Sequence, residues 1–340
     1  MTTSVQVAIP PSQFPENVRR DLLTSLRTRR VNHKFHYDSV KQTQKWLELH
    51  EAHSPARYDK SCLATYNKAF AASVKIIKAK SLHIIGLGCG GGLKDVQLMK
   101  QLQSRGNFFS YTPCDVSLAM VLVARTATRG LLPPEKCFPV VCDLATADDL
   151  PELFARSCGP RTSRLITFFG MIPNFEPQQI LPKLSELLRR NDFLFFSANL
   201  APGDGYTAGL KQILPQYDNP LTRDWLTAFL FDLGVEVRDG ELRFSIETGG
   251  LGLRRVVARF HFRRARRIKV SGQEFPLPVA NPSGFSFRIV TRRPALPSCW
   301  RVTDWKFATN GLRRPPRKVS FFAAGNKPSI RKLSVCRERL

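Results

Sequence analysis

The chain is poor in acidic residues and has no long apolar run. It contains 27 Asp and Glu against 52 Lys and Arg, a formal net charge of +25. A transmembrane helix needs about 18 consecutive apolar residues or more, and no such run exists. Residues 1–5 lack a charged segment followed by an apolar one, so no secretory signal is predicted. We therefore expect neither a membrane protein nor a secreted one.

Metal-binding and disulfide patterns are also missing. The eight cysteines form no CxxC pair, and the six histidines do not combine with them at the spacing of a zinc site. Scattered thiols of this kind are typical of a reducing compartment. We expect a cytoplasmic protein without a metal centre.

The basic excess is unevenly distributed along the chain. Residues 1–250 carry 30 Lys and Arg against 24 Asp and Glu, a net of +6. Residues 251–340 carry 22 against 3, a net of +19. A basic segment with interleaved aromatic residues is a candidate for nucleic-acid binding. It is also compatible with a solvated or degenerate C-terminus, and nucleic-acid binding is not the favoured interpretation.

Short apolar runs alternate with helical patterns in the middle of the chain. This alternation predicts an α/β fold with a doubly wound parallel sheet, in which ligands bind at the carboxyl ends of the strands. After residue 204 the alternation stops, and a helix and short antiparallel strands are predicted as an added α+β part. The expected sheet strands are residues 82–85, 108–111, 138–141, 165–169 and 193–197.

Polar residues follow three of these strands. Gly86, Gly88 and Gly90 form a turn that lets a backbone approach a ligand closely. Asp115 and Asp143 end the next two strands, where carboxylates can bind the hydroxyls of a ribose and the amino group of a base. Helix capping is the alternative role for each aspartate. Together the three positions favour a nucleoside-containing cofactor.

Asn174 follows the fourth strand. Methyl transfer from a sulfonium to nitrogen needs an unprotonated amine held in line with the methyl group, and little acid–base machinery. A side-chain amide can orient such an amine, which makes Asn174 a candidate catalytic residue. The alternative is a turn asparagine that caps the following helix.

These stretches, in this order and over residues 12–290, resemble the histidine-specific, S-adenosylmethionine-dependent methyltransferase family of ergothioneine synthesis, whose members trimethylate the α-amino group of histidine. The resemblance implies a Rossmann-like class I methyltransferase fold and S-adenosylmethionine as cofactor. The matching stretches are residues 36–38, 87–90 with Lys94, 114–117, 142–144, 170–175, 197–202 and 217–218.

The resemblance also assigns roles and parts of the chain. Asn174 and Tyr37 would be catalytic, and no metal is implied. The implied cofactor-binding residues are Gly86, Gly88, Gly90, Lys94, Asp115, Asp143 and Leu144. The implied substrate-binding residues are Tyr37, His53, Asn174, Tyr217 and Ser286. The implied parts are a helical section of the substrate domain (1–60), the cofactor domain (61–203), a substrate-binding insertion (204–282) and a sheet-closing segment with a basic tail (283–340).

The chain departs from the family at several positions. Gly86 or Ile84 stands where an acid commonly precedes the glycine turn, and His53 stands where the family usually has a tyrosine. Residues 283–288 lack the glutamate that grips the imidazole ring. Without that partner, discrimination for histidine falls, so we expect an amino acid or another small amine as acceptor. The alternatives are a nucleic-acid methyltransferase that uses residues 251–340 and a cofactor-binding homologue without activity.

Overall fold

The chain folds into two compact units. The computed structural model describes residues 4–159, 162–171, 174–189, 191–199, 206–248, 254–279, 285–287, 318–324 and 335–336. Unit 1 comprises residues 1–13, 55–200 and 294–340, and unit 2 comprises residues 14–54 and 201–293.

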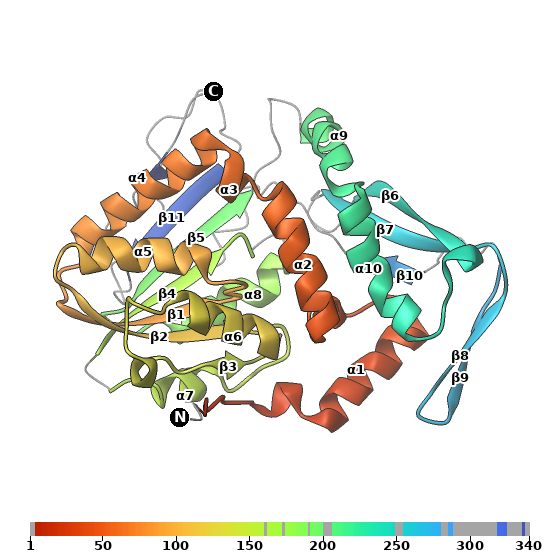
Figure 1. The fold of residues 1–340 in the computed structure, drawn as a ribbon, viewed down its shortest axis with the longest axis horizontal. Coiled ribbons are helices and arrows are strands. Elements are labelled where there is room, and N and C mark those ends of the chain that lie inside the picture. The colour runs from red at the N-terminus through yellow and green to blue at the C-terminus, as the bar shows by residue number, and fades with distance from the viewer. Residues whose placement is uncertain are drawn as a thin grey trace. The chain divides into compact units, whose positions relative to one another are not determined.

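Unit 1 is built on a seven-stranded sheet in the order β12-β11-β5-β4-β1-β2-β3 (Figure 1). The five strands from β5 to β3 run parallel, which confirms the predicted doubly wound α/β sheet. β11 and β12 come from the basic C-terminal segment, and β11 pairs antiparallel with β5. The strands are β1 (Ser81–Leu87), β2 (Phe108–Asp115), β3 (Val140–Val141), β4 (Ser163–Phe169), β5 (Phe193–Asn199), β11 (Lys318–Ala324) and β12 (Val335–Cys336).

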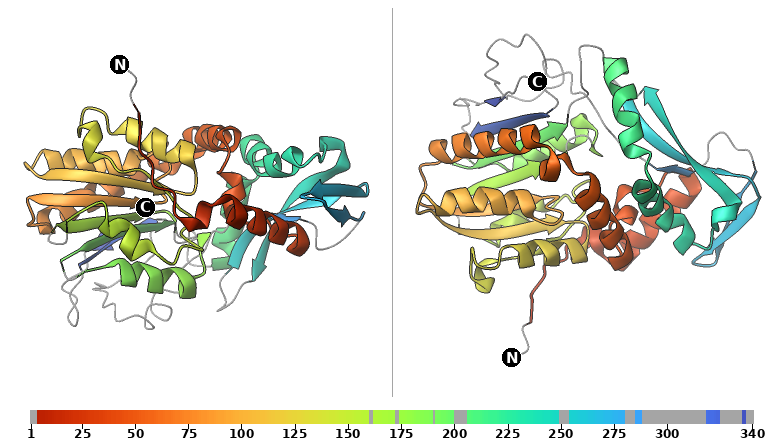
Figure 2. Two further views of the ribbon diagram at one scale, coloured as in Figure 1. Left: turned by 90° about the horizontal axis from the view of Figure 1, so that it is seen from below. Right: turned by 45° about the horizontal axis from the view of Figure 1, so that its top comes forward.

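Helices cover both faces of this sheet, with α4, α5 and α6 on one face and α7 and α8 on the other (Figure 2). Successive side chains of β1 point to opposite faces of the sheet. Ile84 packs in the hydrophobic core on the α4 and α5 face, and Ile85 packs in the core on the α7 and α8 face. The unit's helices are η1 (Pro11–Gln13), α3 (Pro55–Tyr58), α4 (Lys60–Ile76), α5 (Leu93–Gln103), α6 (Leu118–Ala127), η3 (Pro134–Lys136), α7 (Leu150–Ala155) and α8 (Pro177–Leu187).

The third strand is shorter than predicted. The apolar run 138–141 predicted a full strand, but β3 covers only Val140–Val141. Next to β3, Tyr111 and Cys137 form an isolated parallel bridge, and the backbone N–H of Phe138 donates to the Tyr111 carbonyl at 2.8 Å. Pro139 faces away from β2, and its carbonyl accepts a hydrogen bond from the backbone N–H of Ala8 at 3.0 Å. The N-terminal segment thereby lies along β3.

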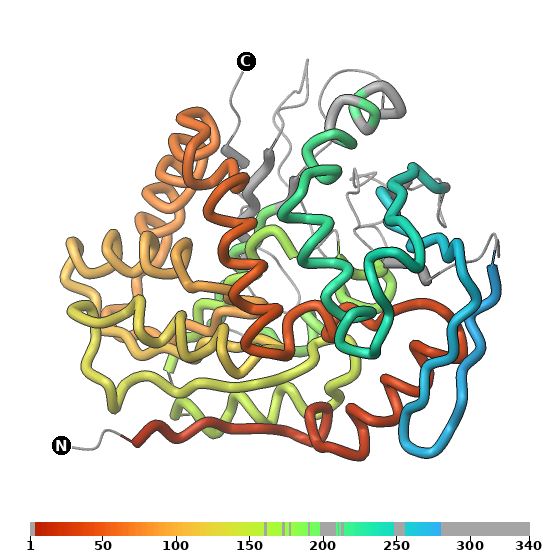
Figure 3. Tube along the Cα trace, turned by 45° about the vertical axis from the view of Figure 1, so that its right-hand side comes forward, coloured from red at the N-terminus to blue at the C-terminus, as the bar shows by residue number. Residues whose placement is uncertain are grey.

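Unit 2 combines helices with antiparallel strands around its own core, which includes Phe35, Trp225, Leu230 and Phe260. Its three-stranded sheet has the order β10-β7-β6. β8 pairs with β9 as a hairpin, the blue loop of the tube in Figure 3. The helices are α1 (Pro15–Thr28), η2 (His33–His36), α2 (Val40–His53), α9 (Tyr206–Tyr217), α10 (Pro220–Asp232) and η5 (Val237–Asp239). The strands are β6 (Gly240–Thr248), β7 (Arg254–Phe262), β8 (Arg266–Val270), β9 (Gln273–Leu277) and β10 (Phe285–Phe287).

Two expected absences concern the described residues only. None of the helices described combines the length and apolar composition that a membrane span requires. Within the same residues, no three His, Cys, Asp or Glu side chains gather in a way that suits a metal ion.

Candidate functional site

The strand order of unit 1 reverses between β1 and β4. In open α/β sheets the carboxyl ends of strands at such a reversal bind ligands. The turn after β1 and the segment after β4 both lie at this edge, and the ends of β2 and β3 follow beside them. The candidate site is therefore the carboxyl edge of the sheet, from β4 to β3.

The turn after β1 requires glycine. Gly88, Gly90 and Gly92 have φ values of +61°, +52° and +73°, a backbone region that other residues rarely adopt. A Cβ on Gly88 would also lie 2.7 Å from the Met171 side chain, closer than real contacts allow. The turn is thus held in one shape by backbone conformation and by close packing.

Asp115 holds the turn from the end of β2. Its carboxylate accepts hydrogen bonds from the backbone N–H of Gly90 at 2.9 Å and of Ser117 at 3.2 Å. Burial raises the pKa of the Asp115 carboxyl, and the backbone hydrogen bonds act in the opposite direction. A carboxylate thus lies directly at the glycine turn.

A second carboxyl lies beneath the turn, and the sequence analysis did not identify it. Asp95, in the first turn of α5, accepts hydrogen bonds from the Tyr111 hydroxyl and the Thr167 hydroxyl, each at 2.7 Å. Its Oδ2 lies 2.4 Å from the place that a Cβ on Gly86 would take. The acid absent from position 86 is therefore supplied from α5, and glycine at 86 leaves room for it.

The carboxyl of Asp95 is buried. Burial raises its pKa, and the hydrogen bonds from Thr167 and Tyr111, with the charge of Lys94, lower it. The signal in the sequence was Gly86 at the strand end together with Asp95 early in the next helix. Only their packing shows that the Asp95 carboxyl fills the space that glycine leaves at position 86.

Lys94 brings a cation to the end of β4. Its Nζ lies 5.4 Å from the centroid of the Tyr66 ring, within the range of a cation–π contact. The same atom is 3.8 Å from the position of a Cβ on Gly170. The Tyr66 hydroxyl shares a hydrogen bond of 2.8 Å with the Ser197 hydroxyl, which fixes the ring. Lys94 therefore lies beside the segment that leads to Asn174.

Asn174 lies over the same turn. Its side-chain N–H₂ group donates to the Met171 sulfur at 3.8 Å, and its backbone N–H donates to the Met171 carbonyl at 2.9 Å. Met171 in turn packs on Gly88. The Asn174 side chain is exposed, so its amide is accessible at the edge of the sheet. Its neighbours Ile172 and Pro173 lie outside the described residues.

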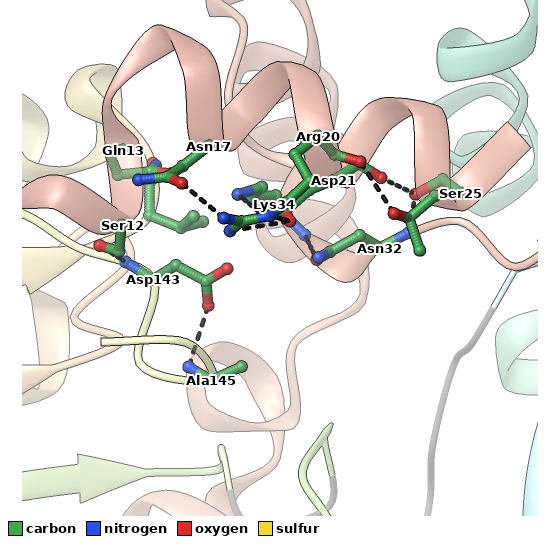
Figure 4. A network of polar contacts seen from close by, with 12 residues as sticks. Ser12, Gln13, Asn17, Arg20, Asp21, Ser25, Asn32, Lys34, Asp143 and Ala145 are labelled. Carbon is green, nitrogen blue, oxygen red and sulfur yellow. Dashed lines mark hydrogen bonds and ion pairs between the residues drawn. The ribbon is translucent and has the colours of Figure 1, made fainter. Parts of the chain in front are cut away.

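Asp143 and Leu144 are buried after β3. The Asp143 carboxylate accepts a hydrogen bond from the backbone N–H of Ala145 at 2.9 Å, and its own backbone N–H donates to the Ser12 hydroxyl at 3.3 Å (Figure 4). The sequence analysis did not anticipate that the N-terminal segment reaches this place. No local sequence pattern predicts the contact between Ser12 and Asp143, because they lie 131 positions apart.

The remaining candidates belong to unit 2. Tyr37 packs on Trp46 and Trp225, with ring centroids 6.2 and 5.3 Å away. His53 is the last residue of α2 and is exposed; Tyr217 ends α9, and Ser286 lies in β10 opposite Arg259. Unit 1 thus brings together the seven cofactor candidates and Asn174, whereas the other four candidates lie in unit 2.

No protein-family model matches the chain. No curated protein matches it either.

Several solved structures resemble the chain weakly. The plantazolicin methyltransferase in complex with SAH is 13% identical, with a TM-score of 0.36, and the match covers 68% of this chain and 83% of that one. An S-adenosylmethionine-dependent methyltransferase from Clostridium acetobutylicum is 9% identical, with a TM-score of 0.41, and the match covers 80% of this chain and 96% of that one. Likenesses of this size define neither reaction nor substrate.

Proposed function

We propose that the chain is an S-adenosylmethionine-dependent N-methyltransferase that acts on an amino acid, histidine included, or on another small amine. The observation that carries this proposal is the pair of buried carboxyls at the glycine turn. Asp115 binds the turn directly, and Asp95 lies beneath it.

The two carboxyls argue against a dinucleotide cofactor. A pyrophosphate at a helix N-terminus needs free backbone N–H groups and a positive potential. Here the N–H of Gly90 already donates to Asp115, and Asp95 occupies the first turn of α5. A phosphate would meet negative groups at both places.

S-Adenosylmethionine fits the same residues better. Its sulfonium and ammonium groups are cations, so carboxylates nearby stabilise it, and its bound charge favours their ionised forms. Its carboxylate would bind the ammonium group of Lys94, which lies beside Gly170. Asp115 retains acceptor capacity for ribose hydroxyls, because each carboxylate oxygen can accept more than one hydrogen bond.

The chemistry asks little of the protein beyond positioning. When bound, the cofactor supplies an activated methyl group that passes to the lone pair of an amine as the bond from carbon to sulfur breaks. Asn174 would hold that amine: its N–H₂ group faces Met171, so its carbonyl oxygen is the atom that accepts the N–H of the acceptor. A hydrogen bond of this kind orients the lone pair toward the methyl group.

The acceptor side is assigned by resemblance and by chemistry. Tyr37, in an aromatic cluster with Trp46 and Trp225, offers a hydroxyl and a π-face that suit an ammonium or an amine. We include His53, Tyr217 and Ser286 in the same proposal. The nucleic-acid alternative rests on residues 251–340, of which 251–253, 280–284, 288–317, 325–334 and 337–340 lie outside the described residues.

Two measurements test the proposal. Calorimetry with S-adenosylhomocysteine should show binding, and mass spectrometry should show methyl transfer to one or more members of a pool of amino acids and amines. Asn174→Ala should abolish turnover while it leaves S-adenosylhomocysteine binding largely intact. Asn191→Ala, the same change at an exposed turn residue of unit 1, is the matched control.

The outcomes separate the parts of the proposal. A purified chain that binds no S-adenosylhomocysteine contradicts the cofactor. Equal turnover in Asn174→Ala and the wild type contradicts the role of Asn174 alone. Binding without methylation of any amine supports a homologue that keeps the cofactor and lacks activity.

A further inference from the structure

The N-terminal segment joins the candidate site from the side of β3. Residue Ala8 bridges Val140: its N–H donates to the Pro139 carbonyl at 3.0 Å, and its carbonyl accepts from the Val141 N–H at 2.9 Å. This pairing carries the next residues toward the carboxyl ends of β2 and β3. Ser12 and Gln13 lie there, in η1.

Both side chains bind the ends of these strands. The Ser12 hydroxyl accepts the backbone N–H of Asp143 at 3.3 Å and donates to the Cys142 sulfur at 3.8 Å. The Gln13 amide N–H₂ donates to the Val116 carbonyl at 2.7 Å. Ser12 and Gln13 thus connect the residue after Asp115 with Asp143, the two positions assigned to the nucleoside. Figure 4 shows Ser12, Gln13 and Asp143.

The contact with Val116 fixes the orientation of the Gln13 amide. A backbone carbonyl can only accept, so the N–H₂ group of Gln13 must face it and the Oε1 atom must point elsewhere. That oxygen is buried, and it has no hydrogen-bond partner in the part of the chain that the structure describes. Buried acceptors in native proteins nearly always accept a hydrogen bond, so we expect a donor to bind this oxygen.

We infer that Gln13 Oε1 accepts a hydrogen bond from the exocyclic amine of the cofactor's adenine, so that the N-terminal segment forms one wall of the base-binding site. This inference rests on the proposed function. Adenine offers an N–H₂ group at the position where hypoxanthine carries a carbonyl oxygen. An inosyl analogue would therefore place two acceptors against each other and leave Gln13 unsatisfied.

The discrimination between these two bases is the quantity to measure. We propose calorimetric Kd values for S-adenosylhomocysteine and S-inosylhomocysteine with the wild type, with Gln13→Met and with Gln103→Met. Methionine keeps the length of glutamine and removes the acceptor together with the donor to Val116; the lost donor affects both compounds alike, so the ratio of the two Kd values reports the acceptor. Gln103, the exposed last residue of α5, is the matched control for the same chemical change.

The wild type should prefer the adenosyl compound by about tenfold or more. Gln13→Met should reduce this ratio by about tenfold, mainly through weaker binding of the adenosyl compound. Gln103→Met should keep the wild-type ratio. Should Gln13→Met lose its far-UV circular dichroism, Gln13→Asn, which withdraws the amide by one methylene, should lower the ratio in the same way.

Two results overturn the inference and remain distinguishable. A ratio that Gln13→Met and Gln13→Asn leave unchanged, while both compounds bind, overturns the assignment of Gln13 and leaves the cofactor in place. Failure of the wild type to bind either compound overturns the proposed function, and the assignment of Gln13 with it.

Discussion

The two units place their charged and polar groups in opposite ways. Unit 1 buries an Arg164–Asp192 ion pair, with 1% and 2% of the two side chains exposed, and carries Asp95 and Asp115 inside its carboxyl edge. Unit 2 holds many ion pairs at its surface, such as Lys45–Asp224 between α2 and α10. Two of its pairs are exceptions, because Lys34 is buried in the pair with Asp21 (Figure 4) and Asp239 is buried in the pair with Arg266.

This difference shows why net charge is a poor guide to the site. The groups that define the candidate chemistry are few, buried and held by specific hydrogen bonds, so the solvent screens them weakly. The surface pairs of unit 2 carry far more charge, but water and salt weaken each of them. The comparison predicts that the same kind of substitution has unequal effects in the two units.

The largest effect is expected for the buried ion pair of unit 1. Arg164→Met would leave the Asp192 carboxylate buried without its guanidinium partner, which donates to it at 2.7 Å through Nε. Removing one member of a buried pair typically costs about 3–5 kcal/mol of unfolding free energy. Urea unfolding, monitored through the hydrogen exchange of peptides from β1 and β4, measures this loss of unfolding free energy. Arg105→Met, at an exposed position, is the control and should change little; a loss below about 1 kcal/mol for Arg164→Met, as for surface pairs, would break the comparison.

Acid should weaken unit 1 through a buried imidazole. His83 is fully buried between the Ser110 and Thr112 hydroxyls, and burial lowers its pKa from 6.5 to about 4. The unfolded chain therefore binds a proton below about pH 6.5 that the folded chain binds only below about pH 4, so stability falls as the pH falls through this window. The expected loss is about 3 kcal/mol.

Urea unfolding at pH 7 and pH 4 measures this loss. His83→Gln, which keeps hydrogen-bonding capacity but cannot titrate in this range, should lose less stability than the wild type between the two pH values. Other groups titrate in both proteins, so the difference between them isolates His83. Equal losses in both proteins would show that the His83 imidazole is protonated normally in the folded state.

Substitutions at Gly86 and Asp95, which pack against each other, should change the unfolding free energy by an intermediate amount. Gly86→Ala forces a methyl group against the Asp95 carboxyl and to within 2.9 Å of the Tyr111 hydroxyl, and should cost about 1–3 kcal/mol, as overpacking does. Asp95→Ala leaves the hydroxyls of Tyr111 and Thr167 without their acceptor, at about 1–3 kcal/mol. In the double variant the new methyl group occupies the space that the Asp95 carboxyl has vacated. The double variant should therefore cost about 1 kcal/mol less than the sum of the two single variants. Strictly additive costs would mean that the two positions are independent.

The same two residues show how far sequence reasoning reaches. The strands, the glycine turn and the acids at the ends of β2 and β3 were predictable, because apolar runs, glycine and strand-end carboxylates are local signals. That Asp95 serves position 86 was not, because it depends on how α5 packs against β1. The contribution of Ser12 and Gln13 was equally hidden, since Gln13 meets Val116 across 103 residues of chain. Such contacts arise only from the tertiary fold.

The smallest effect is expected for the surface pairs of unit 2. The Lys45 ammonium pairs with Asp224, and 25% and 54% of the two side chains are exposed. Solvent competes for both groups, so Lys45→Met should cost about 0.5 kcal/mol or less, and salt should reduce this further. Urea unfolding at low and high salt measures the cost of Lys45→Met, with the fluorescence of tryptophans such as Trp46 and Trp225 in unit 2 as the signal. A cost that matches Arg164→Met and persists at high salt would mean that the two units do not differ in how they use charge.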